Sequence, residues 1–599
     1  MTMRYKNLIE MFFDVAEKYS DKTALLYKEN GKYIGIDYNE FRERVVYFAS
    51  GLISMGISQN DKISILSENK PEWAICDLGI IYSGGITVPI YPTLPEKQIE
   101  YMLNDASVKL IIISKPKHLE KINNIYKNVN SLSFVITLFK CIEKYEFKIM
   151  RFDEVINSGK ENFRYNKAKI DELWTRTDSD DVSTIIYTSG TTGYPKGVML
   201  THRNILSNIE SCLQALYMSY NDVFLSFLPL SHILERTAGQ FLVFYIGATI
   251  AYAESIATIR ENTIEVKPTV IITVPRIFEK MYYTIKLTIE KKPKTIKKIL
   301  LWCLNWGLEY RKEREIGKIS LSTKIKRVIG EILVYKKLRR VIGGRLRFYI
   351  CGGAHLDKKI GEFFDSVGIK IIEGYGLTET SPVIAVNRLE DYKVGTVGKV
   401  IPGVEVKIAE DGEILTRGNN VMKGYYNDEE GTKIVIDEEG WFHTGDLGFL
   451  DRDGYLYITD RKKNIIVISS GKNIAPQLIE ELILTSKYIE QIIIVGHKRK
   501  YLSALVVPNF ENIKDYGKTR KIIYKNIDDL IKHNEIYNLI KREIEIISKN
   551  LNDFEKIKKI TLLNKEFSIE SEELTPSYKI RRNIIEKKYM DIINKMYDS

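Results

Sequence analysis

The stretch that most constrains this chain is Ile185–His202, which reads IIYTSGTTGYPKGVMLTH. An apolar run predicts a buried strand, and six small residues follow it before a second apolar run begins. These six residues are Thr188, Ser189, Gly190, Thr191, Thr192 and Gly193. Their uncovered backbone N–H groups, four hydroxyls and the ammonium of Lys196 are the donors that a polyphosphate needs. The stretch therefore predicts a phosphate-binding loop between two strands.

This loop differs from a Walker A loop, which requires lysine directly after the second glycine and then Ser or Thr. Here Tyr194 and Pro195 separate Gly193 from Lys196, and Gly197 stands where the hydroxyl residue would be. An exposed Gly/Ser/Thr loop without a ligand is the alternative interpretation. Three glycines, four hydroxyls and a lysine between two apolar runs favour phosphate binding.

The size and charge of the chain narrow the class of protein. A chain of 599 residues and 69.3 kDa predicts two or more domains. A net charge of +11 favours anionic small molecules such as nucleotides and CoA, or an acidic membrane surface, and we expect no nucleic-acid partner. The five cysteines are scattered without CxxC spacing, which predicts reduced core residues in a cytoplasmic protein.

No membrane-spanning or export segment is predicted. The first residues carry charges through their apolar part, unlike a signal peptide. The longest apolar stretch, from 241 to 253, falls short of the roughly 20 residues that cross a bilayer and predicts a buried strand or helix. We expect a soluble protein that is at most peripheral to the cytoplasmic face of a membrane.

Strands alternate with helices along the first part of the chain. Strands are predicted at 61–66 and 86–91, with a helix between them at 69–82. Such alternation predicts an α/β fold with parallel sheets. Two later strands, at 346–351 and 370–373, run into turns. Because ligands collect at the carboxyl ends of parallel strands, these turns are candidate binding segments. They contribute Gly352, Gly353, Ala354, Glu373 and Gly374.

The pattern changes twice toward the C-terminus. Short glycine-punctuated runs between 394 and 460 predict a small antiparallel β subdomain. The charged sequence DRKKN at 460–464 predicts a hinge, and a compact α+β domain is predicted beyond it. The stretch from 280 to 345 is helical and basic. A solvated helical excursion is the favoured interpretation, and a face for anionic lipid near Trp302 and Trp306 is the alternative.

Taken together, these motifs resemble those of the adenylate-forming superfamily, the AMP-forming acyl-CoA synthetases, luciferases and peptide-synthetase adenylation domains. The resemblance covers roughly residues 20 to 585. The sequences LSHILERTAG, VPRIF and LTPSYK and the helical excursion are most similar to the long-chain fatty acid–CoA ligases. The resemblance implies an N-terminal adenylation domain at 1–461 and a mobile C-terminal lid domain at 462–599.

The segment EGYGLTE lacks the third glycine of a Rossmann fingerprint. It resembles the adenine and metal segment of the superfamily. The resemblance implies that Tyr375, beside Gly376, stacks on adenine, that Thr378 contacts the α-phosphate, and that Glu379 binds Mg²⁺. A carboxylate suits Mg²⁺ when substrate phosphates supply the other oxygens. Without the surrounding motif, Glu379 would be a helix N-terminal acid stabilised by the dipole.

Further roles follow from the resemblance alone. Asp446 in WFHTGDLG resembles the ribose ligand, although an Asp after Gly is more often a turn residue. Arg461 resembles the arginine that reaches ribose or phosphate, and Lys463 falls on the hinge position. Gly471, with Ser470, resembles the turn that lines the pantetheine path.

Besides Thr378, two further residues are implied as catalytic on the same grounds. Lys579 in ELTPSYKIRR resembles the lysine that the mobile domain carries into the site, although an isolated lysine there would be a surface charge. His232 in LPLSHILER resembles the acyl-site histidine, with a core histidine as the alternative.

The implied activity is ligation of a long-chain fatty acid to CoA with ATP and Mg²⁺, through an acyl-adenylate. An enzyme that loads an acyl carrier protein, and a nucleotide-binding protein without catalysis, are the alternatives. The sequence predicts neither acyl-chain length nor oligomeric state.

Overall fold

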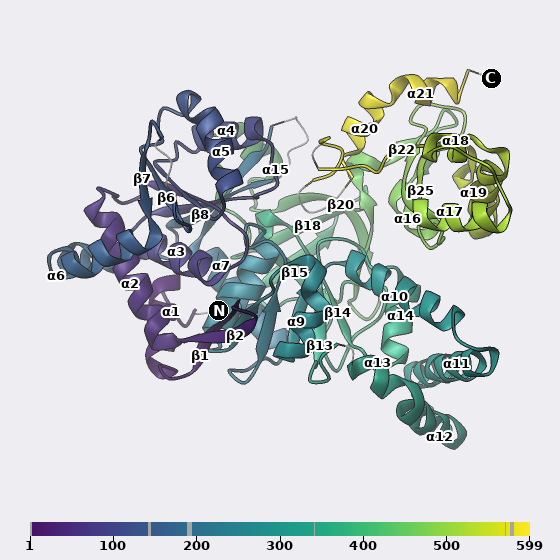
Figure 1. The fold of residues 1–599 in the computed structure, drawn as a ribbon, viewed down its shortest axis with the longest axis horizontal. Helices are drawn as coiled ribbons and strands as arrows, with labels where there is room; N and C mark the ends of the chain where they lie inside the picture. The colour runs from purple at the N-terminus through teal and green to yellow at the C-terminus, as the bar shows by residue number, and fades with distance from the viewer. Residues whose placement is uncertain are drawn as a thin grey trace. The chain divides into compact units, whose positions relative to one another are not determined.

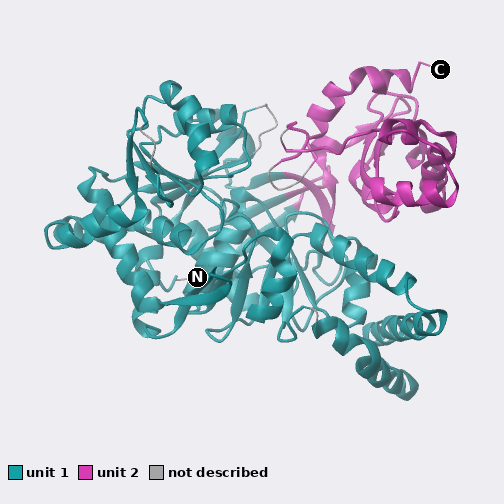
Figure 2. Ribbon diagram, viewed as in Figure 1, with its two compact units in different colours: residues 1–407, 415–444, 450–457 teal, residues 408–414, 445–449, 458–599 magenta. Residues whose placement is uncertain are grey.

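A computed structural model describes residues 3–141, 145–188, 194–340, 342–569, 571–575 and 580–598. The chain forms two compact units, which Figure 2 shows in different colours. Unit 1 comprises residues 1–407, 415–444 and 450–457, and unit 2 comprises residues 408–414, 445–449 and 458–599.

Unit 1 contains a nine-stranded sheet (Figure 1). Its central strands, from β14 to β1, are parallel, and antiparallel strands complete both edges. In spatial order the strands are β16 (Lys399–Val400), β15 (Val383–Val386), β14 (Ile371–Gly376), β13 (Phe348–Cys351), β12 (Val270–Thr273), β10 (Val223–Ser226), β11 (Thr249–Tyr252), β1 (Thr23–Glu29) and β2 (Lys32–Asp37).

An eight-stranded sheet forms the second layer of strands in this unit. Parallel pairing runs from β8 to β7, and β9 and β19 add antiparallel strands at one edge. In spatial order the strands are β19 (Gly424–Tyr425), β9 (Lys196–Thr201), β8 (Val182–Thr188), β4 (Ile86–Ile90), β3 (Lys62–Leu66), β5 (Leu110–Ile113), β6 (Phe134–Thr137) and β7 (Lys148–Arg151).

One hydrophobic core connects both sheets with the helices between and beside them. Helix α3 (Pro71–Tyr82) begins at a proline, as its sequence predicts, and all of its residues except Glu72 are buried. The other helices of this part are α1 (Leu8–Lys18), α2 (Tyr38–Ser54), α4 (Glu96–Asp105), α5 (Pro116–Ile125), α6 (Phe152–Arg176), α7 (His202–Ala215), α8 (Leu242–Tyr245), α9 (Ile259–Val266), α14 (Lys358–Ser366) and α15 (Glu429–Val435).

The basic stretch is helical, as predicted. It forms α10 (Pro275–Glu290), α11 (Lys294–Ile316) and α12 (Leu321–Gly330), followed by the π-helix η4 (Glu331–Tyr335) and α13 (Lys336–Arg340). Helices α11 and α12 lie side by side and extend beyond the nine-stranded sheet (Figure 1).

Four strands between residues 404 and 461 form a further sheet, in the order β17 (Val404–Ile408), β18 (Glu413–Gly418), β20 (Phe442–Leu450) and β21 (Leu456–Arg461). Strands β17 and β18, and strands β20 and β21, are neighbours joined by short turns and therefore run antiparallel. The small antiparallel β subdomain expected from the glycine-punctuated runs is thus present.

Unit 2 is a compact α+β body, as expected. Strands β24 (Ile489–Val495), β25 (Leu502–Pro508) and β26 (Ile557–Leu562) form its sheet, and β22 (Ile466–Val467) pairs with β23 (Asn473–Ile474). Its helices are α16 (Pro476–Ile483), α17 (Phe510–Thr519), α18 (Ile527–Lys532), α19 (Asn534–Ile547), α20 (Arg582–Lys588) and α21 (Met590–Lys595).

The apolar stretch at 241–253 is divided between α8 and β11, and both are buried. Among the described residues, no helix has the length and apolar character that crossing a membrane requires.

Candidate active site

The two strands predicted around the phosphate loop are present. Strands β8 and β9 are antiparallel neighbours, and Thr188 at the end of β8 lies opposite Lys196 at the start of β9. The loop residues between them, Ser189 to Gly193, lie outside the described residues. The strand pair therefore brings two of the predicted phosphate ligands to one end of the eight-stranded sheet.

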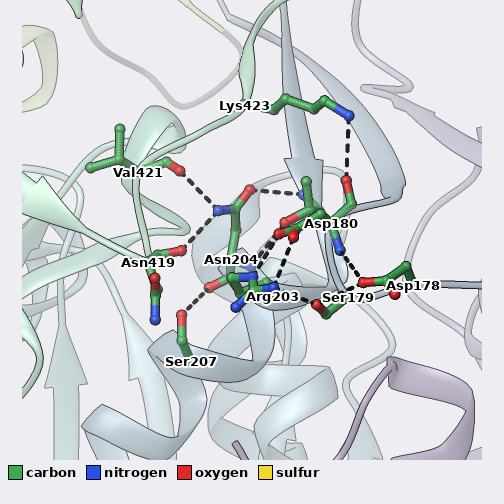
Figure 3. Close-up of polar contacts among 10 residues, drawn as sticks. Asp178, Ser179, Asp180, Arg203, Asn204, Ser207, Asn419, Val421 and Lys423 are labelled. Carbon is green, nitrogen blue, oxygen red and sulfur yellow. Dashed lines mark hydrogen bonds and ion pairs between the residues drawn. The ribbon is translucent and has the colours of Figure 1, made fainter. Parts of the chain in front are cut away.

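A polar network fixes the other end of this strand pair (Figure 3). Arg203, in the first turn of α7, forms a bidentate ion pair with Asp180 at 2.6 and 2.8 Å. Asp180 precedes β8 in the chain. The amide of Asn204 donates to the carbonyl oxygens of Asn419 and Val421, both at 2.8 Å. These contacts fasten a distant segment, residues 419–426, beside the loop strands.

The backbone of residues 419–426 joins the exit strand to the predicted metal ligand. On one side, Tyr426 N–H donates to Gly197 O at 2.7 Å and Lys423 N–H donates to Met199 O at 3.1 Å. On the other side, Met422 N–H donates to Glu379 O at 2.8 Å. Alternate N–H groups of one extended segment thus bond strand β9 and the Glu379 backbone.

Side chains of the same region connect Lys196 with Glu379. The Lys196 ammonium forms an ion pair with Asp428 at 2.8 Å and lies 4.7 Å from the centre of the Tyr425 ring. The Tyr425 hydroxyl donates to Glu379 Oε1 at 3.1 Å. A hydrogen bond from Lys196 lowers the pKa of Asp428. Two residues singled out by their motifs therefore contact the same tyrosine, Lys196 through the ring and Glu379 through the hydroxyl.

The segment from Glu373 to Glu379 keeps its shape through a close backbone approach. A Cβ on Gly376 would lie 1.7 Å from Pro382 O, so only glycine fits there. Leu377 N–H donates to that same carbonyl at 3.0 Å. Glu379 follows in a short 3₁₀ helix, η5 (Thr378–Thr380), and is partly buried.

The carboxyl ends of β13 and β14 come together as predicted. A Cβ on Gly352 would lie 3.2 Å from Leu234 and 3.7 Å from Gly374 O, which places three predicted segments around one point. Gly353 has a positive φ of 83°, and Ala354 is exposed. Glu373, at the end of the parallel run, is buried, and burial raises its pKa to about 8.

The side chain of His232 is neither fully buried nor fully exposed. Its Nδ1 accepts a hydrogen bond from Leu234 N–H at 3.1 Å. Because Nδ1 accepts, a neutral imidazole carries its proton on Nε2. The ring centre of His232 lies 6.5 Å from that of Tyr91, in an edge-on arrangement.

A buried ion pair anchors the helix that follows His232. Arg236 and Asp77 on α3 are fully buried, and their charged groups are 2.5 Å apart. Gln240 also donates to Asp77, at 2.8 Å. Residues Glu235–Phe241 form a π-helix, η2, and α8 (Leu242–Tyr245) continues it.

Glu235 in this π-helix is a buried carboxyl group. Ser226 donates to its Oε1 at 2.6 Å, and its Oε2 has no partner among the described residues. Burial raises its pKa from 4.5 to about 8, so the folded chain retains a proton that the unfolded chain loses. The free energy of unfolding that Glu235 contributes is therefore present below pH 4.5 and is lost as the pH rises to about 8.

We accordingly expect Glu235→Gln to raise the melting temperature, Tm, increasingly as the pH rises from about 4.5 to 8. Thermal unfolding of both proteins across this range measures the difference. A constant difference between the two Tm values at all pH values would contradict a buried neutral carboxyl at position 235.

Unit 2 brings together the two predicted ribose ligands. Asp446 on β20 is buried, and Arg461 at the end of β21 pairs with its carboxylate at 2.9 Å. Lys463 is exposed in the short 3₁₀ helix η6 (Lys462–Asn464), directly after this strand. Gly471 occupies an exposed turn with a positive φ of 76°. Lys579 lies outside the described residues.

Two family models match the chain. The model of the AMP-binding enzyme matches residues 12–426, and the model of the AMP-binding enzyme C-terminal domain matches residues 463–599. The chain belongs to the AMP-binding enzyme family. The resemblance that the motifs indicate is therefore confirmed, and the two sheets, the β subdomain and the separate C-terminal body are the fold of an adenylate-forming enzyme.

Relatives of this AMP-binding enzyme include the long-chain-fatty-acid–CoA ligase FadD15 of Mycobacterium bovis. It is 31% identical over 599 residues, which cover 99% of this chain and 97% of that protein. The long-chain-fatty-acid–[acyl-carrier-protein] ligase AEE15 of Arabidopsis thaliana is 29% identical, covering 99% and 87%. The ATP-bound crystal structure of MatB from Rhodopseudomonas palustris has the same fold, with a TM-score of 0.69, 21% identity and coverage of 98% and 99%.

The donor set of the AMP-binding enzyme fits ATP with Mg²⁺. In the described part of the chain, no group of three or more His, Cys, Asp or Glu could hold a metal ion by itself. Mg²⁺ commonly binds through one or two carboxylates together with substrate phosphates, and Glu379 is such a carboxylate. Lys196, about one quarter exposed, can pair with a phosphate as a point charge.

Sequence reasoning missed Tyr425, Asp428 and the segment that carries them. They contact Lys196 and Glu379 although they are far from Lys196 in the chain. The sequence GYYND around them has the composition of an ordinary turn, and no spacing rule relates it to the phosphate loop. Only strand pairing between β9 and β19 brings these residues to the site.

Proposed function

We propose that this AMP-binding enzyme is a long-chain-fatty-acid–CoA ligase. Its family membership, the name of its relative FadD15 and the motifs similar to the long-chain branch support this proposal. ATP, Mg²⁺ and CoA are its co-substrates. The free cysteines, four of them buried, support a cytoplasmic location, and peripheral contact with an anionic membrane would suit a substrate that partitions into lipid.

In the first half-reaction, the fatty carboxylate attacks the α-phosphorus of ATP and pyrophosphate leaves. A carboxylate oxygen is a poor leaving group, and adenylation converts it into a good one. We assign phosphate binding to Thr188, Ser189, Gly190, Thr191, Thr192, Gly193 and Lys196. Thr378 contacts the α-phosphate, Glu379 holds Mg²⁺, and Lys579 neutralises charge on the α-phosphoryl oxygens. These groups act by positioning and charge neutralisation.

Other residues bind the rest of the nucleotide and the second substrate. We assign adenine to the turn after β13 and to the last residues of β14, where Tyr375 is the stacking ring. Asp446 accepts from the ribose hydroxyls, and Arg461, which pairs with it, holds this carboxylate in place. His232 borders the acyl site, and Gly471 lines the path of pantetheine. In the second half-reaction, the CoA thiol attacks the acyl-adenylate and AMP leaves.

The observation that carries the proposal is the contact chain from Lys196 through Tyr425 to Glu379. It brings the proposed phosphate-binding cation and the proposed metal-binding carboxylate into contact with one tyrosine. Acid-dependent exchange of pyrophosphate into ATP, measured across fatty acids of increasing length, tests the proposal. Exchange that requires no fatty acid, or that prefers short acids, would contradict it.

An acyl carrier protein is the second candidate acceptor, because the relative AEE15 bears that name. The two candidates share the first half-reaction and differ only in the thiol that attacks. Supplying purified CoA or a purified carrier protein with its pantetheine arm separates them. Thioester formed on CoA at equal thiol concentrations supports the ligase, and thioester formed only on the carrier supports the alternative.

We also propose an adenylation domain at 1–461 and a lid domain at 462–599 that moves between the half-reactions about Lys463. Proline fixes φ near −65°, so Lys463→Pro should restrict a hinge that has to change φ. We expect this variant to form acyl-adenylate but to lose most thioester formation, measured as separate half-reactions. Equal loss of both half-reactions would contradict a hinge at this position.

A further inference from the structure

Helix α12 and the π-helix that continues it expose a line of aliphatic side chains. The exposed fractions are 75% for Leu321, 53% for Ile325, 59% for Val328, 40% for Ile329 and 67% for Ile332. The spacing of i, i+4, i+7, i+8 and i+11 places these five residues on one helical face, which we call the apolar stripe.

The opposite face of the same helix is firmly attached to α11. Thr323 is fully buried and donates to Glu313 on α11 at 2.9 Å. Lys326 pairs with Glu309 at 2.9 Å, and the Arg327 guanidinium lies 5.1 Å from the centre of the Tyr310 ring. The orientation of α12 is therefore set by these contacts, and the apolar stripe is held outward.

Basic residues surround the apolar stripe. Residues 291–347 contain 18 of the 89 Lys and Arg residues and 4 of the 78 Asp and Glu residues, so the rest of the chain has a net charge of −3. Five exposed cations flank the stripe in sequence and make no ion pair within the described part of the chain. They are Lys318, Lys324, Lys336, Lys337 and Arg340.

We propose that the apolar stripe and its flanking cations dock this enzyme onto an anionic membrane surface. An aliphatic helical face bordered by lysines lies at the boundary between headgroups and acyl chains, and each lysine adds attraction to anionic lipid. Protein interfaces, by contrast, are enriched in aromatic residues and arginine and depleted in lysine. The aliphatic stripe and the excess of lysine therefore favour lipid over a protein partner.

The sequence favours a solvated helical excursion and leaves a face for anionic lipid as the alternative. The exposed stripe supports this alternative. A solvated helix directs polar residues outward, whereas five aliphatic residues of α12 and η4 point outward here.

Vesicle binding is measured without ATP, CoA or fatty acid, so its outcome does not depend on the proposed ligase activity.

Binding of the full-length protein to two kinds of vesicle tests the proposal. One kind contains phosphatidylcholine alone, and the other contains one part phosphatidylglycerol to about two parts phosphatidylcholine. We expect stronger binding to the second kind. The triple variant Ile325→Ser, Val328→Ser, Ile332→Ser should bind the vesicles with phosphatidylglycerol at least about tenfold more weakly, because the inserted apolar surface is lost.

The chain offers a matched control for this variant. Ile434, Ile523 and Ile546 are 78%, 94% and 57% exposed and lie on other elements. Replacing all three by Ser removes a similar aliphatic surface and should leave vesicle binding unchanged. Replacing Lys318, Lys324 and Lys336 by Gln should weaken binding to the anionic vesicles on the order of 10²-fold while leaving the weak binding to phosphatidylcholine unchanged.

Two outcomes would overturn the proposal. The first is equal binding of the wild-type protein and the Ile325/Val328/Ile332 variant to the anionic vesicles, with both proteins folded by thermal unfolding. The second is a wild-type dimer in sedimentation velocity that this variant converts to a monomer, because the stripe would then be covered by a second copy of the chain.

Discussion

The variant Lys579→Ala is expected to form acyl-adenylate 10²–10³ times more slowly than the wild-type enzyme, the cost of losing one donor to a developing oxyanion. Negative charge grows on the α-phosphoryl oxygens as the fatty carboxylate approaches phosphorus. An ammonium held beside them stabilises that transition state more than bound ATP. Conversion of supplied acyl-adenylate and CoA to thioester should remain nearly normal, because that step needs no new charge on phosphorus. Rapid-quench measurement of each half-reaction provides both rates.

Two neighbouring arginines serve as controls, but only one of them makes a side-chain ion pair in the described part of the chain. Arg581 forms no side-chain ion pair among the described residues, so Arg581→Ala should keep both half-reactions. Arg582 donates to Ile494 O and pairs with the buried Glu480 at 2.6 Å. The pair with Glu480 indicates that Arg582 is a structural residue.

Removing one partner of a buried ion pair typically costs about 3–5 kcal/mol. Arg582→Ala should therefore lower Tm. At temperatures below the new Tm, the variant should carry out both half-reactions normally. A large adenylation defect in Arg581→Ala, together with normal adenylation in Lys579→Ala, would refute the assignment of Lys579.

The second large effect is expected for Lys196→Ala. Pyrophosphate exchange should fall on the order of 10²-fold, because the variant loses the cation at the start of β9 and leaves Asp428 unneutralised beside the nucleotide. The Lys196–Asp428 pair is about one quarter to one third exposed, and such pairs contribute only about 0–1 kcal/mol to stability. Tm should accordingly stay close to the wild-type value while the exchange rate collapses.

Lys423→Ala is the matched control for Lys196→Ala. Lys423 lies in the same segment as Tyr425, but its ammonium donates to Asp180 O at 3.4 Å (Figure 3). Its replacement should leave exchange within about twofold of wild type. Full exchange activity in Lys196→Ala, or an equal loss in Lys423→Ala, would be incompatible with the role assigned to the phosphate loop.

Local pattern predicts much of this fold because strands and helices follow from short-range periodicity. The strand predicted at 86–91 is present at Ile86–Ile90, and the helix predicted at 69–82 runs from Pro71 to Tyr82. The helical segment from Glu235 to Tyr245 shows what local pattern misses. Arg236 and Gln240 are polar yet buried because both bond to Asp77, which lies 159 residues before Arg236.

The sequence by itself determined the class of the fold and predicted a phosphate loop, because both depend on residues that are adjacent in the chain. It also determined the candidate ligands Glu379 and Asp446, through motifs of a few residues each. Tertiary structure alone decided which of the predicted site residues contact a common neighbour. Strand pairing brings Tyr425 between Lys196 and Glu379, and helix packing decides that the aliphatic face of α12 points outward. Both depend on contacts between segments far apart in the chain, which no local pattern encodes.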